Sequence, residues 1–201
     1  MAEARAELWI WRHPKPIGAA GRCIGRTDLP VDPRRAKRLA HRIRQHARRH
    51  GLPHEICSSP LRRCADVARW LRRWGWRHHV DARLLELDFG AWDGQAWTAI
   101  PHAEVAVWEA DFTDHAPCGG ESLGQLRVRV GGYLADPAGG RRPRLVVGHA
   151  GWTNALRTSG REVVAVGDWP VPPRYGQLTV WNGTSGSQPI CPNPAARALS
   201  K

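Results

Sequence analysis

Residues 8–16 read Leu-Trp-Ile-Trp-Arg-His-Pro-Lys-Pro, so that four apolar residues run directly into Arg12 and His13. The apolar run, with its bulky and β-branched side chains, predicts a strand that is buried on both faces. Pro14 and Pro16 then end any regular structure. Because open α/β sheets bind ligands beyond the carboxyl ends of their strands, the charged pair is a candidate site. The alternative is that Arg12 and His13 only end a strand at the surface.

The segments after this strand alternate between helical and extended patterns. A loop rich in glycine and proline covers residues 18–33, and apolar residues at helical spacing predict a helix over 33–50. A short strand is expected over 54–57. The hydroxyl side chains and proline at 58–60 predict the start of the next helix, over 61–71. The order strand, helix, strand, helix predicts a parallel sheet.

We expect one domain over residues 1–182, with an α/β fold. It is predicted to be a three-layer sandwich, with a mostly parallel central sheet and helices on both faces. Glycine, serine, proline and alanine dominate from residue 183 on, which predicts a disordered tail over 183–201. The other expected elements are strands over 79–82, 145–147, 163–166 and 178–181, helices over 98–108, 121–134 and 152–156, and a surface turn over 137–143.

The composition is that of a basic, globular protein. Arginine accounts for all but three of the 30 basic residues, and the formal net charge is +12. The arginines are spread along the chain without a nucleic-acid-binding motif, so we expect a small anionic substrate and no nucleic acid. Five cysteines without C-x-x-C spacing argue against a disulfide framework or a zinc site. No signal peptide or membrane-length apolar stretch is found, which predicts a cytoplasmic protein that binds no membrane.

Two strands of the predicted sheet end in a histidine, His13 after the first and His149 after a later one. In a parallel sheet both ends lie at the same edge, so the two imidazoles can meet. The helix start at 59–63 belongs to this edge and adds backbone N–H and guanidinium groups. Together these groups describe an anion pocket sized for a phosphoryl group. Glu86 or Asp88, on a loop that follows, could close over it.

Five short motifs, which include the residues of this edge, follow one another along the chain. They are Arg12-His13, Ser-Ser-Pro-Leu-Arg-Arg-Cys at 58–64, Leu-Glu-Leu-Asp-Phe-Gly-Ala-Trp-Asp-Gly at 85–94, Gly-Glu-Ser at 120–122 and Gly148-His149. In this order they resemble the histidine phosphatase superfamily, whose fold is phosphoglycerate mutase-like, and they cover essentially residues 8–182. Within the superfamily, the stretches 21–30 and 87–94 are most similar to the alpha-ribazole phosphatases of cobalamin biosynthesis.

The resemblance implies a phosphatase that needs no metal and no other cofactor. His13 is the implied nucleophile, which becomes phosphohistidine, and His149 binds the phosphoryl oxygens beside it. Glu86 is the implied general acid, with Asp88 left open as a competitor. A neutral imidazole among cations is a good nucleophile, and arginine forks stabilise the charge of the transferred group. The residues implied in substrate binding are Arg12, Arg63 (with Arg62 as the alternative in the same motif), Arg26 and Thr27.

Three residues depart from the pattern of the superfamily. Pro14 and Ala150 replace glycines, and Ala19 stands where many relatives carry an asparagine, which leaves the geometry of the pocket loops open. Three tryptophans near these loops either stack on a flat base or pack in the core, namely Trp92, Trp97 and Trp152.

The expected function is metal-independent hydrolysis of a phosphomonoester through phosphohistidine. The expected substrate is alpha-ribazole 5′-phosphate or adenosylcobalamin 5′-phosphate. A broad-specificity sugar or nucleotide phosphatase, or a phosphoglycerate mutase-like enzyme, is the alternative. A non-catalytic phosphate-binding or phosphoprotein-binding module is a further alternative. We expect a monomer or a homodimer whose partner is a small phosphorylated substrate.

Overall fold

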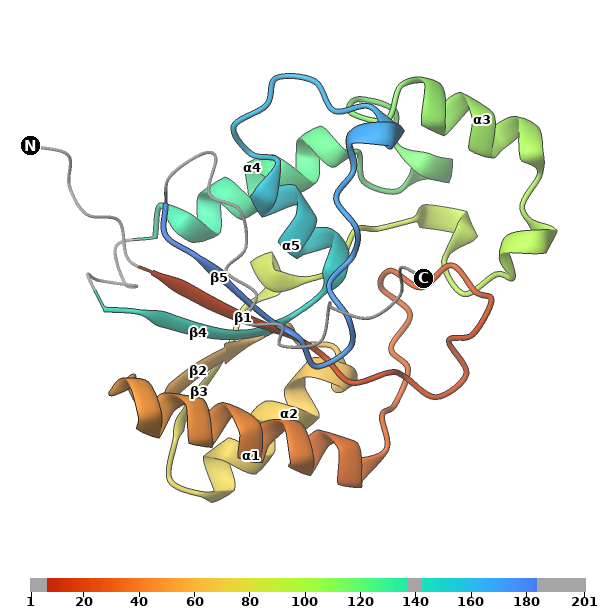
Figure 1. Cartoon of the computed structure of the whole chain (residues 1–201). Coiled ribbons are helices and arrows are strands. Elements are labelled where there is room, and N and C mark those ends of the chain that lie inside the picture. Colours follow the sequence, from red (N-terminus) through yellow and green to blue (C-terminus); the bar gives the residue numbers. More distant parts are fainter. Residues whose placement is uncertain (1–6, 137–141, 184–201) are drawn as a thin grey trace, which may run out of the picture.

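The central layer of the computed structural model, which describes residues 7–136 and 142–183, is a five-stranded sheet in the order β3-β2-β4-β1-β5 (Figure 1). Four strands run parallel, and β5 pairs antiparallel with β1 at one edge. The predicted α/β fold with a mostly parallel sheet is confirmed. The strands are β1 (Leu8–Arg12), β2 (Glu55–Ser58), β3 (Arg77–Val80), β4 (Arg144–Gly148) and β5 (Leu178–Trp181).

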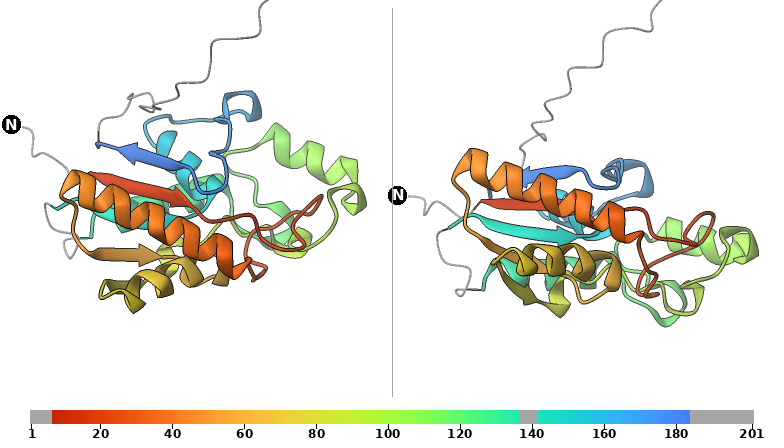
Figure 2. Two further views of the ribbon diagram at one scale, coloured as in Figure 1. Left: turned by 60° about the horizontal axis from the view of Figure 1, so that its bottom comes forward. Right: turned by 90° about the horizontal axis from the view of Figure 1, so that it is seen from below.

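Helices cover both faces of this sheet, and β1 separates two hydrophobic cores (Figures 1 and 2). Trp9 and Trp11 pack with residues of α1 and α2 on one face. Leu8 and Ile10 pack with residues of α4 and α5 on the other, as expected for a strand buried on both sides. The helices are α1 (Pro33–His50), α2 (Arg62–Arg73), α3 (His102–Ala110), α4 (Leu123–Leu134) and α5 (Ala150–Arg157), with single 3-10 turns η1 (Ala82–Leu84), η2 (Gly90–Trp92), η3 (Trp97–Ala99), η4 (Pro117–Gly119) and η6 (Val166–Asp168).

The ends of β1 and β4 bring the two predicted histidine positions to one edge of the sheet. Arg12 pairs with Gly148 in the register of these parallel strands. The backbone N–H of His13 donates to the carbonyl oxygen of Gly148 over 3.0 Å. His13 and His149 therefore leave the sheet side by side, as expected for residues that follow two parallel strands.

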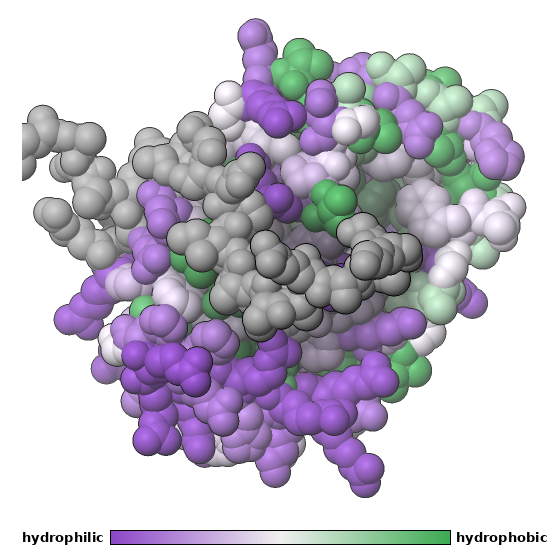
Figure 3. Space-filling view, in the orientation of Figure 1, coloured by the Kyte–Doolittle hydropathy of each residue, from purple (hydrophilic) through white to green (hydrophobic). Residues whose placement is uncertain are grey.

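α1 begins and ends where the sequence predicted. The Asp32 side chain accepts the backbone N–H groups of Arg34 and Arg35, and Gly51 ends the helix with a left-handed φ of 61°. The apolar stripe faces the sheet while the arginines point outward, so the face formed by α1 and α2 is hydrophilic (Figure 3). Within the described residues, none of the cations of α1 forms an ion pair with a carboxylate.

Two strand predictions need correction. Residues 163–166 form no strand, because the hydroxyl of Thr113 both accepts from the backbone N–H of Val164 and donates to its carbonyl oxygen. A side chain thus satisfies backbone groups that a sheet would otherwise pair. The strand predicted over 79–82 lies two residues earlier, since the carboxylate of Asp81 accepts a backbone N–H of η1 and turns the chain there.

Two helix predictions also differ from the structure. The helix expected over 98–108 is interrupted at Pro101, which separates η3 from α3. The hydroxyl groups at 58–60 do not cap α2. Instead, the carboxylate of Asp28, from the loop after β1, accepts the backbone N–H of Arg62 over 2.6 Å.

Two predictions lie outside the described residues, at least in part. The tail was predicted over 183–201, of which residues 184–201 lie outside the described chain. Most of the turn predicted over 137–143 also lies outside it. The domain extent of 1–182 stays a prediction. Among the described residues, no helix is both long and apolar enough to cross a membrane.

Candidate active site

His13 lies just beyond β1, and its ring faces that of His149 with 5.1 Å between the ring centroids. The Nδ1 atom of His13 is 2.7 Å from the carbonyl oxygen of Pro14. Because a carbonyl only accepts, this nitrogen carries the proton, and Nε2 keeps its lone pair. Pro14, a departure from the superfamily pattern, thus holds the tautomer that a nucleophilic imidazole needs.

Both histidines are held neutral. Burial is the largest cause that lowers the pKa of His13 well below its usual value, and the charge of Arg63 lowers it further. Burial and then Arg63 lower the pKa of His149 in the same way. The Nδ1 atom of His149 accepts from Nε of Arg63 over 3.3 Å, so the proton of this neutral ring is on Nε2.

Two guanidinium groups flank the histidines. Arg63 is 1% exposed and donates to two loop carbonyl oxygens besides His149. Arg12 lies over the ring of Tyr175 at 3.9 Å and donates to the carbonyl oxygen of Pro173 over 2.7 Å. In the described part of the chain, the buried Nε–H of Arg12 has no hydrogen-bond partner, and neither guanidinium forms an ion pair. Such groups favour a bound anion.

The Glu86 carboxylate is bound at the N-terminal end of α5. Its Oε2 accepts the backbone N–H of Gly151 over 3.0 Å, and its Oε1 accepts those of Trp152 over 3.0 Å and Leu87 over 3.1 Å. A Cβ atom at Gly151 would lie 2.5 Å from Oε1, so only glycine allows this approach. At this edge the N-terminus of α5 therefore binds the carboxylate of Glu86, while the first N–H of α2 binds the carboxylate of Asp28.

Arg129 of α4 holds the segment that carries Glu86. Its guanidinium donates to the carbonyl oxygens of Arg83, Leu85 and Glu86, and it pairs with the carboxylate of Glu121 over 2.6 Å. These contacts of Arg129 tie the segment that carries Glu86 to α4.

The structure does not bring Asp88, Arg26 or Thr27 into the cavity. Asp88 pairs with Arg26 over 2.9 Å. Asp93 accepts three successive backbone N–H groups of the loop that holds Arg26 and Thr27, and the Thr27 hydroxyl as well. Two carbonyl oxygens of the same loop accept from Arg63. Arg26 and Thr27, which were predicted to bind substrate, therefore lie outside the cavity, in the loop whose carbonyl oxygens accept from Arg63.

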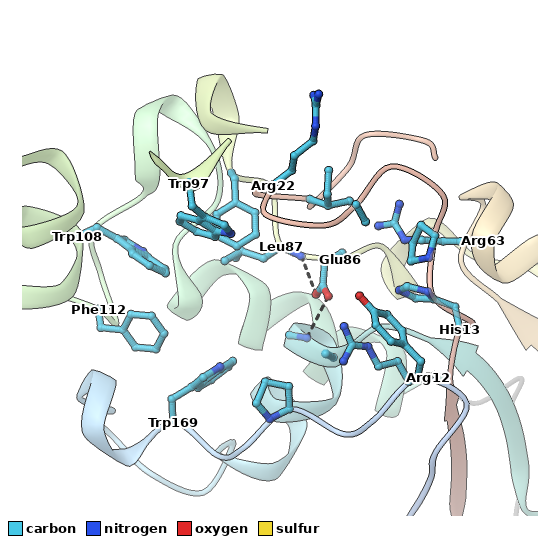
Figure 4. A pocket seen from close by; sticks show the side chains of 18 residues that line it. Arg12, His13, Arg22, Arg63, Glu86, Leu87, Trp97, Trp108, Phe112 and Trp169 are labelled. Carbon is cyan, nitrogen blue, oxygen red and sulfur yellow. Dashed lines mark hydrogen bonds between the residues drawn. The ribbon is translucent and has the colours of Figure 1, made fainter. Parts of the chain in front are cut away.

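The nucleophile candidate His13, the two guanidinium groups and the Glu86 carboxylate meet in a cavity of about 370 Å³ (Figure 4). His149 is fully buried and does not line the cavity, and Arg62 is exposed outside it. Among the described residues, no group of three or more His, Cys, Asp or Glu side chains could hold a metal ion. One end of the cavity is lined by four predicted residues, Arg12, His13, Arg63 and Glu86.

Comparison with protein-family models assigns the chain to a family. The model of the histidine phosphatase superfamily (branch 1) matches residues 8–186. The chain belongs to the histidine phosphatase superfamily. Its mostly parallel sheet with helices on both faces agrees with the phosphoglycerate mutase-like fold of that superfamily. A search of curated proteins finds no match.

Solved structures similar to this histidine phosphatase include phosphatases. A mycobacterial glucosyl-3-phosphoglycerate phosphatase is 28% identical with a TM-score of 0.70, covering 87% of this chain and 89% of that one. The structure described as mycobacterial hydrolase 1 is 28% identical with a TM-score of 0.71, covering 87% and 90%. A protein from Thermus thermophilus, TTHB049, is 25% identical with a TM-score of 0.66, covering 92% and 97%. The chain is therefore a phosphomonoesterase, which sets aside a non-catalytic module.

The aromatic half of this histidine phosphatase's cavity escaped the sequence analysis. The rings that line it include Trp108, Phe112, Trp169 and Tyr175. Of Trp92, Trp97 and Trp152, the three tryptophans named from the sequence, only Trp97 lines the cavity. The other two are buried in the core. Apart from Trp108 and Phe112, which are four residues apart, these rings come from segments far apart in the chain, so no single local pattern collects them. The only sign of these rings in the sequence was its high tryptophan content, with 11 tryptophans in the chain.

Proposed function

We propose that this phosphomonoesterase works by two phosphoryl transfers through His13. In the first, Nε2 of His13 attacks phosphorus, the P–O bond to the leaving alcohol breaks, and Glu86 gives that oxygen its proton. In the second, Glu86 takes a proton from water while the water oxygen attacks phosphorus, which releases inorganic phosphate and neutral His13. Each transfer returns Glu86 to the state that the other needs.

The observation that carries this proposal is a neutral imidazole with a free Nε2 beside two guanidinium groups without carboxylate partners. A phosphoryl group bound there would form the charge-assisted hydrogen bonds that no carboxylate forms with these two groups. The guanidinium forks of Arg12 and Arg63 would bind its equatorial oxygens, where charge is spread in the transition state. The same cations disfavour protonation of His13 and so keep its lone pair available.

Two further roles are assigned from hydrogen bonding. Oε1 of Glu86 accepts two backbone N–H groups and Oε2 only one, so Oε2 is the oxygen that carries the transferred proton. For His149 we keep the role of binding the phosphoryl oxygens, because its ring lies 5.1 Å from that of His13. Its Nδ1 is engaged by Arg63 and its Nε2 lies 3.5 Å from Sγ of Cys64, so a phosphoryl oxygen would replace the contact with sulfur. Arg26 and Thr27 are reassigned from binding the substrate to positioning the loop.

For the substrate we propose alpha-ribazole 5′-phosphate or adenosylcobalamin 5′-phosphate. The support is the similarity of stretches 21–30 and 87–94 to alpha-ribazole phosphatases. In the structure Asp93 binds the first stretch, so both act as one unit beside the cavity. A broad-specificity phosphatase or mutase-like enzyme is the second candidate, since a similar mycobacterial enzyme is named a glucosyl-3-phosphoglycerate phosphatase. We further propose a cytoplasmic, metal-independent monomer or homodimer with one domain over 1–182.

Rapid quenching during turnover tests the mechanism. With an ester labelled in its phosphoryl group, and with EDTA present, the label should stay on the peptide that holds His13 after alkaline quench. It should be lost after acid quench, because phosphohistidine is acid-labile. His13→Asn should abolish the label, whereas His102→Asn, at an exposed position of α3, should retain it. A label on a serine or cysteine peptide, or activity that needs added Mg²⁺, would overturn the mechanism.

A further inference from the structure

Five aromatic side chains line one part of the cavity. The four that are labelled in Figure 4, Trp97, Trp108, Phe112 and Trp169, lie opposite His13 and Arg63. Successive rings of this set have centroids 5.0 to 6.1 Å apart and interplanar angles of 60 to 84°. Edge-to-face contacts of this kind are favourable and hold each ring against the next. We call the set the aromatic wall; in contact order it consists of Trp97, Phe89, Trp108, Phe112 and Trp169.

Contacts within the protein hold the aromatic wall in place. Behind it, Trp92 packs edge-to-face against Trp108 at 5.8 Å, and its Nε1–H donates to the carboxylate of Glu104 over 2.8 Å. Phe112 is 8% exposed and belongs to the hydrophobic core that includes residues of α4 and α5. Trp97, by contrast, is 40% exposed. A wall that is already ordered loses little conformational entropy when a ligand stacks on it.

This end of the cavity offers few hydrogen-bonding side chains that would bind a sugar. Among the described residues that line the cavity, Glu86 is the only carboxylate, and it lies at the phosphoryl end. Arg22 is the only cation there besides Arg12 and Arg63, and its Nη1 donates to the carbonyl oxygen of Gly94 over 3.0 Å. A polyhydroxylated group would leave its hydrogen-bonding capacity largely unmet against the wall, whereas a flat ring would stack on it.

We infer that the aromatic wall binds an uncharged aromatic ring of the leaving alcohol. The substrate class is then a phosphomonoester whose alcohol carries such a ring a few bonds from the ester oxygen. This inference rests on the proposed function for the phosphoryl end and deepens it at the other end. A benzimidazole nucleoside belongs to this class and a glucosyl glycerate does not. Stacking that persists in the transition state raises kcat/KM.

Matched alkyl esters test the inference. 3-Phenylpropyl, 3-cyclohexylpropyl and propyl phosphate release similar primary alkoxides and so need similar help from the general acid. We expect kcat/KM for the phenylpropyl ester to exceed that for the propyl ester by about 5- to 150-fold, the range for one base stacking on an aromatic side chain. The cyclohexylpropyl ester should fall clearly below the phenylpropyl ester. Equal values for these two would mean an apolar pocket without preference for a ring and would overturn the inference.

Variants of the wall locate the effect. Trp97→Leu and Trp169→Leu remove ring faces and keep an apolar side chain, so each should lower the phenylpropyl-to-propyl ratio of kcat/KM toward one. The matched control is Trp74→Leu, at a half-buried tryptophan beside α2 that does not line the cavity. It should leave the ratio unchanged. A ratio that survives both wall variants would place the preference elsewhere and refute the assignment.

A binding measurement separates this inference from the proposed mechanism. Calorimetry with 3-phenylpropylphosphonate and propylphosphonate, which are not hydrolysed, reports on the wall without turnover. Tighter binding of the aryl phosphonate that is lost in Trp97→Leu supports the wall even if no label is trapped on His13. Equal binding of both phosphonates overturns the wall even if phosphohistidine forms.

Discussion

Gly151→Ala would place a methyl group where the Glu86 carboxylate now lies. The added Cβ would be 2.5 Å from Oε1 and 3.1 Å from Cδ of Glu86, whereas ordinary contact begins at 3.4 Å. The carboxylate must therefore move by roughly 1 Å, a displacement that can lower a rate by on the order of 10²-fold. The backbone tolerates alanine, because φ of Gly151 is not positive and alanine favours helices by roughly 0.5–1 kcal/mol over glycine.

We expect Gly151→Ala to stay folded and to lose about 10²-fold in the phosphorylation rate of an alkyl phosphate. The loss for 4-nitrophenyl phosphate should be much smaller, because nitrophenolate leaves without a proton. Single-turnover rates with both esters check this. The matched control is Gly131→Ala in α4, where an added Cβ meets nothing within 4 Å, and it should keep both rates.

A double-mutant cycle shows whether the effect passes through the acid. In a Glu86→Ala background, Gly151→Ala should cost nothing further, since the group that it displaces is gone. An unchanged alkyl-ester rate in Gly151→Ala, or the same loss in the Glu86→Ala background, would refute this reasoning.

The remaining predictions concern the acid and the histidines. Glu86→Gln should slow phosphorylation by alkyl esters ~10²–10⁴-fold and by 4-nitrophenyl phosphate much less, in single-turnover assays. Asp88→Asn should show no such dependence on the leaving group, because Asp88 is paired with Arg26 outside the cavity; a selective loss in this variant would reassign the acid. Burial and Arg63 lower the pKa of His13 and His149 below the unfolded value of about 6.5, so the unfolded chain binds more protons at acid pH. The free energy of unfolding, from denaturant titrations, should therefore fall as the pH drops from 7 to 5, and less steeply in His149→Gln.

Local patterns explain why much of the fold was predicted. The apolar stripe of α1 and the glycine at its end depend only on neighbours along the chain, so both were found at their correct places. The strand predicted over 163–166 failed for the opposite reason. The hydroxyl that satisfies the backbone of Val164 belongs to Thr113, which is 51 residues away in sequence.

By itself, the sequence determined that histidines follow two core strands and that arginines and a carboxyl group are available beside them. These features depend on apolar runs and on the order of elements, which are local. Only the tertiary structure decided that Glu86 rather than Asp88 reaches the cavity, that Arg26 and Thr27 lie in a loop outside it, and that rings from several segments line it. The contact of Glu86 with Gly151 spans 65 residues and depends on where α5 begins in space. Such contacts are fixed by packing across the fold, which no local pattern encodes.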